Sequence, residues 1–116
     1  MAAAFLPRRG NPVILSDEFL RAEVPSINGV HTARSLARLY AALGSDDGLD
    51  GVRLWSPETR RRATMPQSDR RDLVLGVRMR WQLGFARPFP RHAISEEAFG
   101  WYGTFGSGAY ADPARD

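Results

Sequence analysis

The residues best suited to chemistry or ligand binding lie in a glycine-rich stretch near the carboxyl end, residues 99–113. Glycines permit tight turns and close backbone approach. The aromatic side chains between them are of the kind that forms a core or the wall of a cleft. Ser107 lies between Gly106 and Gly108, but Phe105 occupies the first glycine position of a G-x-S-x-G nucleophile motif. That motif is therefore absent.

The basic residues restrict the chemistry further. All 16 are arginine, and both lysine and cysteine are absent from the chain. Without lysine, residues 1–116 supply no Schiff base, no phosphate-loop lysine and no Ser-x-x-Lys nucleophile pair. Without cysteine, they also form no disulfide and supply no zinc ribbon or cysteine nucleophile. With only two histidines, a His-rich metal site is not expected, and we expect no metal and no cofactor.

Three other groups of polar residues have simpler interpretations. His31 is a general-base candidate, but no motif places a serine or an acid beside it, which favours a structural or exposed histidine. The acidic loop at 45–51 lacks the spacing and the terminal glutamate of a calcium loop. The arginine runs at 60–62 and 70–71 suit phosphates, yet the net charge is only +3. We expect exposed faces there and no nucleic-acid partner.

Length and composition indicate one globular domain. The chain has 116 residues, of which 43% are hydrophobic and 25% charged, as in ordinary soluble proteins. The apolar opening is followed, not preceded, by Arg8 and Arg9, the reverse of a signal peptide. No apolar run approaches the roughly 20 residues that span a bilayer. We expect a cytoplasmic protein without a membrane span.

Three helices are predicted from start and stop signals. A short one begins at Ser16 and ends before Pro25. The second runs from Thr32 to Leu43, with Gly44 as its terminating residue. Its apolar stripe has the i, i+3, i+4, i+7 spacing of one helix face: Leu36, Leu39, Tyr40 and Leu43. The third begins at Ser56-Pro57-Glu58, runs to about Thr64 and stops before Pro66.

The second half of the chain predicts strands. Residues 66–72 are expected to be a charged loop, followed by extended chain from Leu73. Apolar and polar residues alternate over 77–83, which indicates a strand with one solvated face. Ala98–Gly103 and Ser107–Ala111 are expected to be strands of one sheet. The fold class is therefore α+β, with helices packed on an antiparallel sheet.

Two stretches, in this order, resemble a known family. The first is residues 25–43, followed by Leu54 and Ser56-Pro57-Glu58-Thr59 at the family's L-S-P-E-T position. The second is Trp81–Phe85, followed by residues 99–113. Over about residues 11–113 the chain resembles the serine β-lactamase-like hydrolases: class C β-lactamases, penicillin-binding-type peptidases and especially family VIII carboxylesterases.

The resemblance implies a partial β-lactamase/DD-peptidase-like fold and acyl-serine hydrolysis of a small ester or lactam. Relatives use an S-x-x-K nucleophile and a Y-x-N-type tyrosine, both N-terminal of the first stretch. Trp101-Tyr102-Gly103 resembles their third motif in its W-x-G form, which lines the acyl pocket. No catalytic residue is assigned, because the nucleophile serine and lysine pair is absent. Phe105 departs from the family by replacing a glycine of the G-x-G-G-S pattern.

The resemblance therefore predicts a C-terminal fragment, residues 1–116, truncated at both ends and inactive alone. The expected partner is either a separate N-terminal chain that supplies S-x-x-K or, through exposed apolar surface, a second copy of this chain. The alternative hypothesis is a non-catalytic binding or complementing module. Trp101, Tyr102 and Phe105 would then form an aromatic ligand wall.

Overall fold

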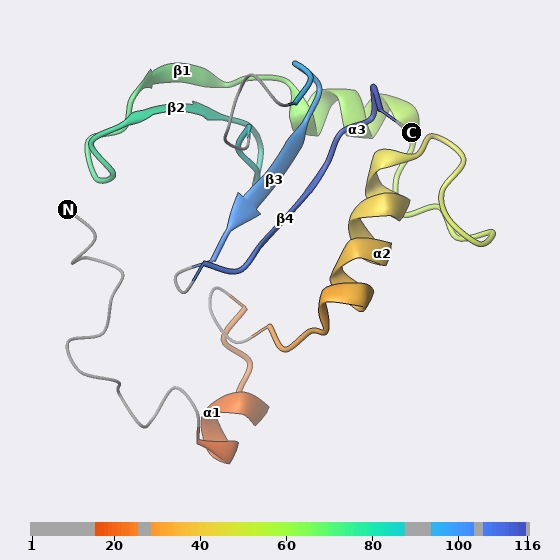
Figure 1. Ribbon diagram of the computed structural model, residues 1–116, viewed down its shortest axis with the longest axis vertical. Helices are drawn as coiled ribbons and strands as arrows, with labels where there is room; N and C mark the ends of the chain where they lie inside the picture. The colour runs from red at the N-terminus through yellow and green to blue at the C-terminus, as the bar shows by residue number, and fades with distance from the viewer. Residues whose placement is uncertain (1–15, 26–28, 88–93, 104–105, 116) are drawn as a thin grey trace.

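The computed structural model describes residues 16–25, 29–87, 94–103 and 106–115, which form three helices and four strands (Figure 1). The elements are α1 (Asp17–Arg21), α2 (Ala33–Gly44), α3 (Pro57–Thr64), β1 (Ser68–Arg71), β2 (Arg78–Trp81), β3 (Phe99–Tyr102) and β4 (Gly108–Ala111). Both strand pairs are antiparallel. The α+β prediction is confirmed.

All three helices begin where the sequence predicted, because a hydroxyl caps each one. Ser16, Thr32 and Ser56 accept a hydrogen bond from the backbone N–H three residues later. At α2 the Ser35 hydroxyl accepts the Thr32 backbone N–H in return, at 3.1 Å. These bonds satisfy amide donors that a helix start otherwise leaves unpaired.

Gly44 ends α2 as predicted, although not as a left-handed glycine cap. It is the last residue of α2, the C-cap is Ser45 in extended conformation, and Gly44 does not adopt a left-handed backbone. Its lack of a side chain serves packing instead. A Cβ at Gly44 would lie 3.0 Å from the Cβ of Ala111, closer than ordinary contact. Glycine here lets the end of α2 approach β4.

The charged loop predicted at 66–72 was wrong, because Ser68–Arg71 forms β1 and pairs with β2. No apolar alternation marks β1, so its extended conformation depends on the partner strand. Asp69 contributes an ion pair to Arg78 at 2.8 Å. The turn falls at 73–77, where extended chain was predicted. There the Asp72 carboxylate accepts the N–H groups of Val74 and Leu75 at 2.9 and 2.8 Å.

The alternation predicted over 77–83 holds within β2 only. Met79 is buried and Arg78 exposed, as expected. Beyond the strand the pattern fails, since Leu83 is exposed and Gln82 buried.

The backbone of Ala86 joins the two strand pairs. Its N–H donates to the carbonyl oxygen of Gly100 at 2.9 Å, and the Gly100 N–H donates back at 3.1 Å. On its other side Ala86 forms a bridge with Trp81. The predicted pairing of the 98–103 and 107–111 segments is confirmed by β3 and β4, whose register sets Gly100 opposite Tyr110.

Phe99 is the centre of the core, with a side chain that is fully buried. Its ring centroid lies 5.1 Å from Phe85, 5.8 Å from Trp55 and 6.3 Å from Tyr40. Trp55 is fixed in turn by its indole N–H, which donates to the Leu43 carbonyl at 2.9 Å. This aromatic cluster holds α2 and the 55–57 segment against β3.

Replacing Phe99 with Ala should lower the free energy of unfolding by about 3 to 5 kcal/mol, because a buried ring is lost and a cavity remains. Chemical denaturation measures the change. The control Leu83→Ala removes an exposed side chain and should cost less than about 0.5 kcal/mol. Equal effects of the two variants would contradict the placement of Phe99.

Candidate functional site

Trp101 and Tyr102, two of the residues assigned by resemblance to the acyl pocket, end strand β3 and are partly exposed. Successive side chains of a strand point to opposite faces. Trp101 therefore shares the face of buried Phe99, whereas Tyr102 shares the face of Gly100. The structure thus places these two side chains on different sides of the sheet.

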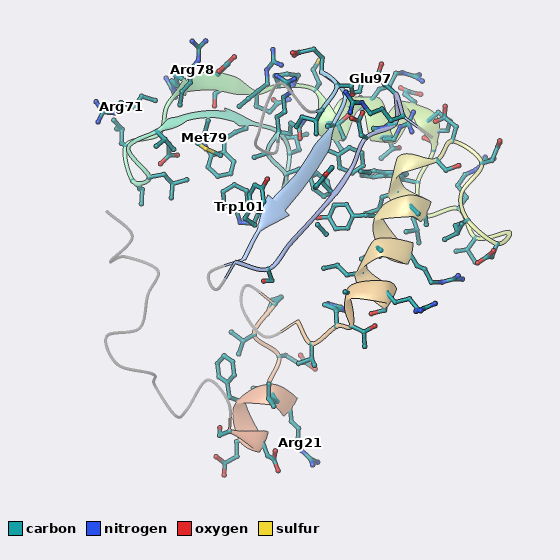
Figure 2. The ribbon with its side chains drawn as sticks, in the orientation of Figure 1. Arg21, Arg71, Arg78, Met79, Glu97 and Trp101 are labelled. Atoms are coloured by element: carbon teal, nitrogen blue, oxygen red, sulfur yellow. The ribbon has the colours of Figure 1, made fainter. Side chains whose placement is uncertain are left out.

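Trp101, labelled beside β3 in Figure 2, is held by a second tryptophan, Trp81, from the neighbouring hairpin. The ring centroids of Trp81 and Trp101 lie 4.9 Å apart, tilted by 43°, and Trp101 keeps 40% of its surface exposed. Such pairs contribute about 0.5–1.5 kcal/mol beyond area burial. The arrangement presents an apolar aromatic wall to solvent in a fixed position.

Asp72 in turn orients Trp81. Its Oδ2 accepts the Trp81 indole N–H at 3.0 Å. The backbone N–H of Leu75, together with those of Val74 and the Trp81 indole, lowers the pKa of Asp72 below its ordinary value. The carboxylate is therefore ionised at neutral pH and acts as a fixed acceptor. Sequence reasoning missed Asp72, although an Asp at the start of a turn is a known signal for such bonding.

Gly103, the third residue assigned to the pocket, closes the β3–β4 hairpin. Its N–H donates to the Ser107 carbonyl at 2.6 Å, and the Gly106 N–H donates to the Gly103 carbonyl at 3.2 Å. A Cβ at Gly103 would lie 2.3 Å from the Ser107 hydroxyl oxygen, so a side chain here would require the Ser107 side chain to move. Phe105, named in the aromatic-wall hypothesis, lies outside the described residues.

Tyr102 packs across a glycine of the partner strand. A Cβ at Gly108 would lie 2.7 Å from Cδ1 of Tyr102, and the two residues are cross-strand partners. The missing side chain at Gly108 makes room for the tyrosine ring, which therefore stabilises the hairpin end.

A hollow of about 490 Å³ lies elsewhere, between α2 and β4. Small helix residues, Ala37 and Ala41, line it beside Tyr110. Sequence reasoning missed this hollow; the signal was the small residues on α2. Its charges are already engaged with one another: Arg60 pairs with Asp46 at 3.0 Å.

Asp112 ties the end of β4 to the residues that precede β3. Its Oδ2 accepts the Ser95 backbone N–H at 2.9 Å, and the Ser95 hydroxyl donates to Oδ1. Burial of the carboxyl opposes ionisation, but these bonds, with the Ala114 N–H and Arg115, outweigh it and lower the pKa of Asp112. This contact closes the β3–β4 unit around the core.

The remaining sequence candidates lie apart from that wall. His31 is exposed just before α2. In the acidic loop Asp46 pairs with Arg60 and Asp50 with Arg38. Within the ranges that the structure describes, no cluster of three acidic or histidine side chains is suited to a metal ion. In those same ranges, no helix has the length and apolar character needed to cross a bilayer.

Comparison with known proteins gives two informative similarities, although no family model matches the chain. The chain is 38% identical over 100 residues to the esterase/β-lactamase LipL of Mycobacterium tuberculosis, an alignment covering 81% of this chain and 22% of LipL. The crystal structure of a penicillin-binding protein homologue from Caulobacter crescentus superposes with a TM-score of 0.79. It is 43% identical, over 86% of this chain and 28% of that one.

The chain is therefore a relative of the β-lactamase-like serine hydrolases, as the resemblance predicted. Its helices and small antiparallel sheet match one part of that fold. It spans about a fifth of the curated relative and under a third of the structural one.

The lowered pKa of Asp112 predicts an acid-sensitive contribution to stability. The ionised carboxylate stabilises the fold fully above the ordinary value of 3.8, and the contribution is lost as the pH falls through the folded-state pKa. The difference in unfolding free energy between wild type and Asp112→Asn should therefore shrink below about pH 4.

Denaturation at neutral and acidic pH measures this difference. The control Asp47→Asn changes an exposed carboxylate and should show little difference at either pH. A gap between wild type and Asp112→Asn that stays constant down to acidic pH would contradict the assignment.

Proposed function

We propose that this chain forms part of an acyl-serine hydrolase acting on esters or lactams, and that it supplies the wall of the acyl pocket. One observation carries the proposal. Trp101, at the W-x-G position, is held partly exposed by Trp81 at the end of β3. The similarity to an esterase/β-lactamase over most of the chain supports the same role.

The wall would act by holding the acyl group of the substrate. An apolar aromatic surface removes water from one side of the acyl chain and fixes its direction relative to a nucleophile, which is a positioning contribution to catalysis. Asp72 and Trp81 keep Trp101 in one orientation, so little ordering remains to be done on binding. The W-x-G form favours esters over lactams.

The nucleophile would come from polypeptide outside residues 1–116. With no lysine in these residues, they supply no Ser-x-x-Lys pair, and acylation needs a nucleophile, its base and oxyanion donors held together. We propose that a preceding segment or a separate chain provides that pair.

The alternative is a binding module that uses the same aromatic wall without catalysis. The partly exposed Trp81–Trp101 pair favours it, since this surface needs no further residue to hold an apolar ligand. The two functions differ in whether added nucleophile-bearing polypeptide produces turnover.

Residues 1–116 alone should not hydrolyse p-nitrophenyl butyrate or nitrocefin above the background rate, because the nucleophile and its base are missing. Chromogenic assays and labelling by a fluorophosphonate probe measure this. Stoichiometric labelling of any serine, with turnover lost when that serine becomes Ala, would contradict the assignment of the nucleophile to other polypeptide.

A chimera tests the pocket directly. When this chain replaces the matching segment of LipL, ester hydrolysis should persist. Trp101→Ala in the chimera should lower kcat/KM about ten-fold, as expected for roughly 1.4 kcal/mol of lost transition-state binding.

The matched control is Tyr110→Ala, an exposed aromatic side chain whose register with Gly100 assigns it to the opposite face. It should change kcat/KM less than about two-fold. Equal losses of kcat/KM in the two variants would contradict the pocket assignment. An unchanged kcat/KM in the Trp101→Ala chimera would also contradict it.

A further inference from the structure

The turn of the β1–β2 hairpin exposes apolar side chains to an unusual degree. Leu73 is 95% exposed, the highest value among the large apolar residues that the structure describes. Val74 and Val77 on the same turn are 59% and 51% exposed. Scattered single apolar residues on a surface are ordinary, whereas a contiguous cluster marks a contact surface.

A network of hydrogen bonds fixes this turn in shape. The Asp72 N–H donates to the Val77 carbonyl and the Gly76 N–H to the Asp72 carbonyl, both at 2.9 Å. Asp72 Oδ1 accepts two further turn amides, and Gly76 takes a left-handed φ of +70°. The apolar side chains are therefore presented by a rigid turn, so little ordering entropy opposes their burial against a partner.

Arginines surround the base of that turn. The last strand pair before it sets Arg71 opposite Arg78, and like charges at directly opposed positions destabilise a hairpin. Figure 2 labels both at the outer part of the hairpin. Arg70 is exposed beside them. Asp69 offsets part of this charge through its bond to Arg78. The hairpin thus combines an apolar tip with a positive collar.

We propose that the β1–β2 hairpin docks on an anionic lipid surface. Leu73 and Val74 would enter the boundary between headgroups and acyl chains, and Arg70 and Arg71 would meet lipid phosphates. Peripheral binding of this kind combines apolar burial with attraction to anionic headgroups. A nucleic acid would use the arginines but leave Leu73 in water, so the exposed tip favours lipid.

This inference does not rest on the proposed hydrolase function. It adds to it, because a hydrolase docked in this way would meet esters held at a lipid–water boundary.

Flotation with vesicles tests the proposal, since bound protein rises with the vesicles while aggregated protein sinks. The 116-residue chain should float with phosphatidylglycerol vesicles and far less with phosphatidylcholine vesicles. Leu73→Asp combined with Val74→Ser should weaken binding about ten-fold or more. Arg70→Gln combined with Arg71→Gln should weaken it about thirty-fold at low salt.

The matched control changes an exposed apolar residue and its neighbouring arginine on another loop, Val52→Ser with Arg53→Gln. It should leave binding unchanged, and circular dichroism should show the same fold for every variant. No flotation of the wild type would overturn the proposal. So would loss in the arginine variant alone with full competition by DNA, which would indicate a polyanion site. Self-association that depends on Leu73, without vesicle binding, would identify a second copy as the partner and also overturn it.

Discussion

The backbone pairing of Ala86 with Gly100 is the contact on which the rest of the sheet depends. Two hydrogen bonds at this point, of 2.9 and 3.1 Å, connect the two two-stranded hairpins. Two-stranded hairpins alone are marginally stable in water. Space at the junction is limited, because a Cβ at Gly100 would lie 2.2 Å from the Ala109 carbonyl oxygen. The junction sets Trp81 and Trp101 within stacking distance.

A chain of ion pairs supports the same junction. Glu96 forms ion pairs with Arg80 of β2 and with the buried Arg87, which follows Ala86. The Glu96–Arg87 pair has an N–O distance of 2.9 Å. Arg87 also donates to the backbone carbonyls of Ile94 and Ser95 at 3.3 and 3.2 Å. A buried guanidinium is tolerated only when paired and hydrogen-bonded in this way. These contacts tie the segment before β3 to the other hairpin, so charge and backbone pairing position the aromatic wall together.

Local signals explain how much of the fold the sequence could predict. Thr32 and Ser56 are caps whose bonds form within one turn, so their helices were found at the right starts. The Gly-rich hairpin of β3 and β4 was found for the same reason, since turn chemistry is local. Strand β1 was missed because Ser68–Arg71 carries no pattern of its own and is extended only through pairing with β2. The packing role of Gly44 was missed because its neighbour, Ala111, is distant in sequence.

The features of the candidate site also fall into those that the sequence could predict and those that it could not. The positions of Trp101, Tyr102 and Gly103 on a strand and its turn followed from sequence and resemblance. The stacking of Trp81 on Trp101, the bond from Trp81 to Asp72 and the separation of Trp101 and Tyr102 onto opposite faces did not. Those features require the register of two hairpins and the junction at Ala86, which no local pattern reveals.

The most direct measurement is a crystal structure of the LipL chimera whose nucleophilic serine has been phosphonylated, with loss of fluoride, by a fluorophosphonate carrying a short alkyl chain. If this chain supplies the pocket wall, the alkyl chain will contact the Trp101 ring where it packs beside Trp81. If the alkyl chain instead lies against Tyr110 in the hollow between α2 and β4, or touches no residue of this chain, that role is wrong.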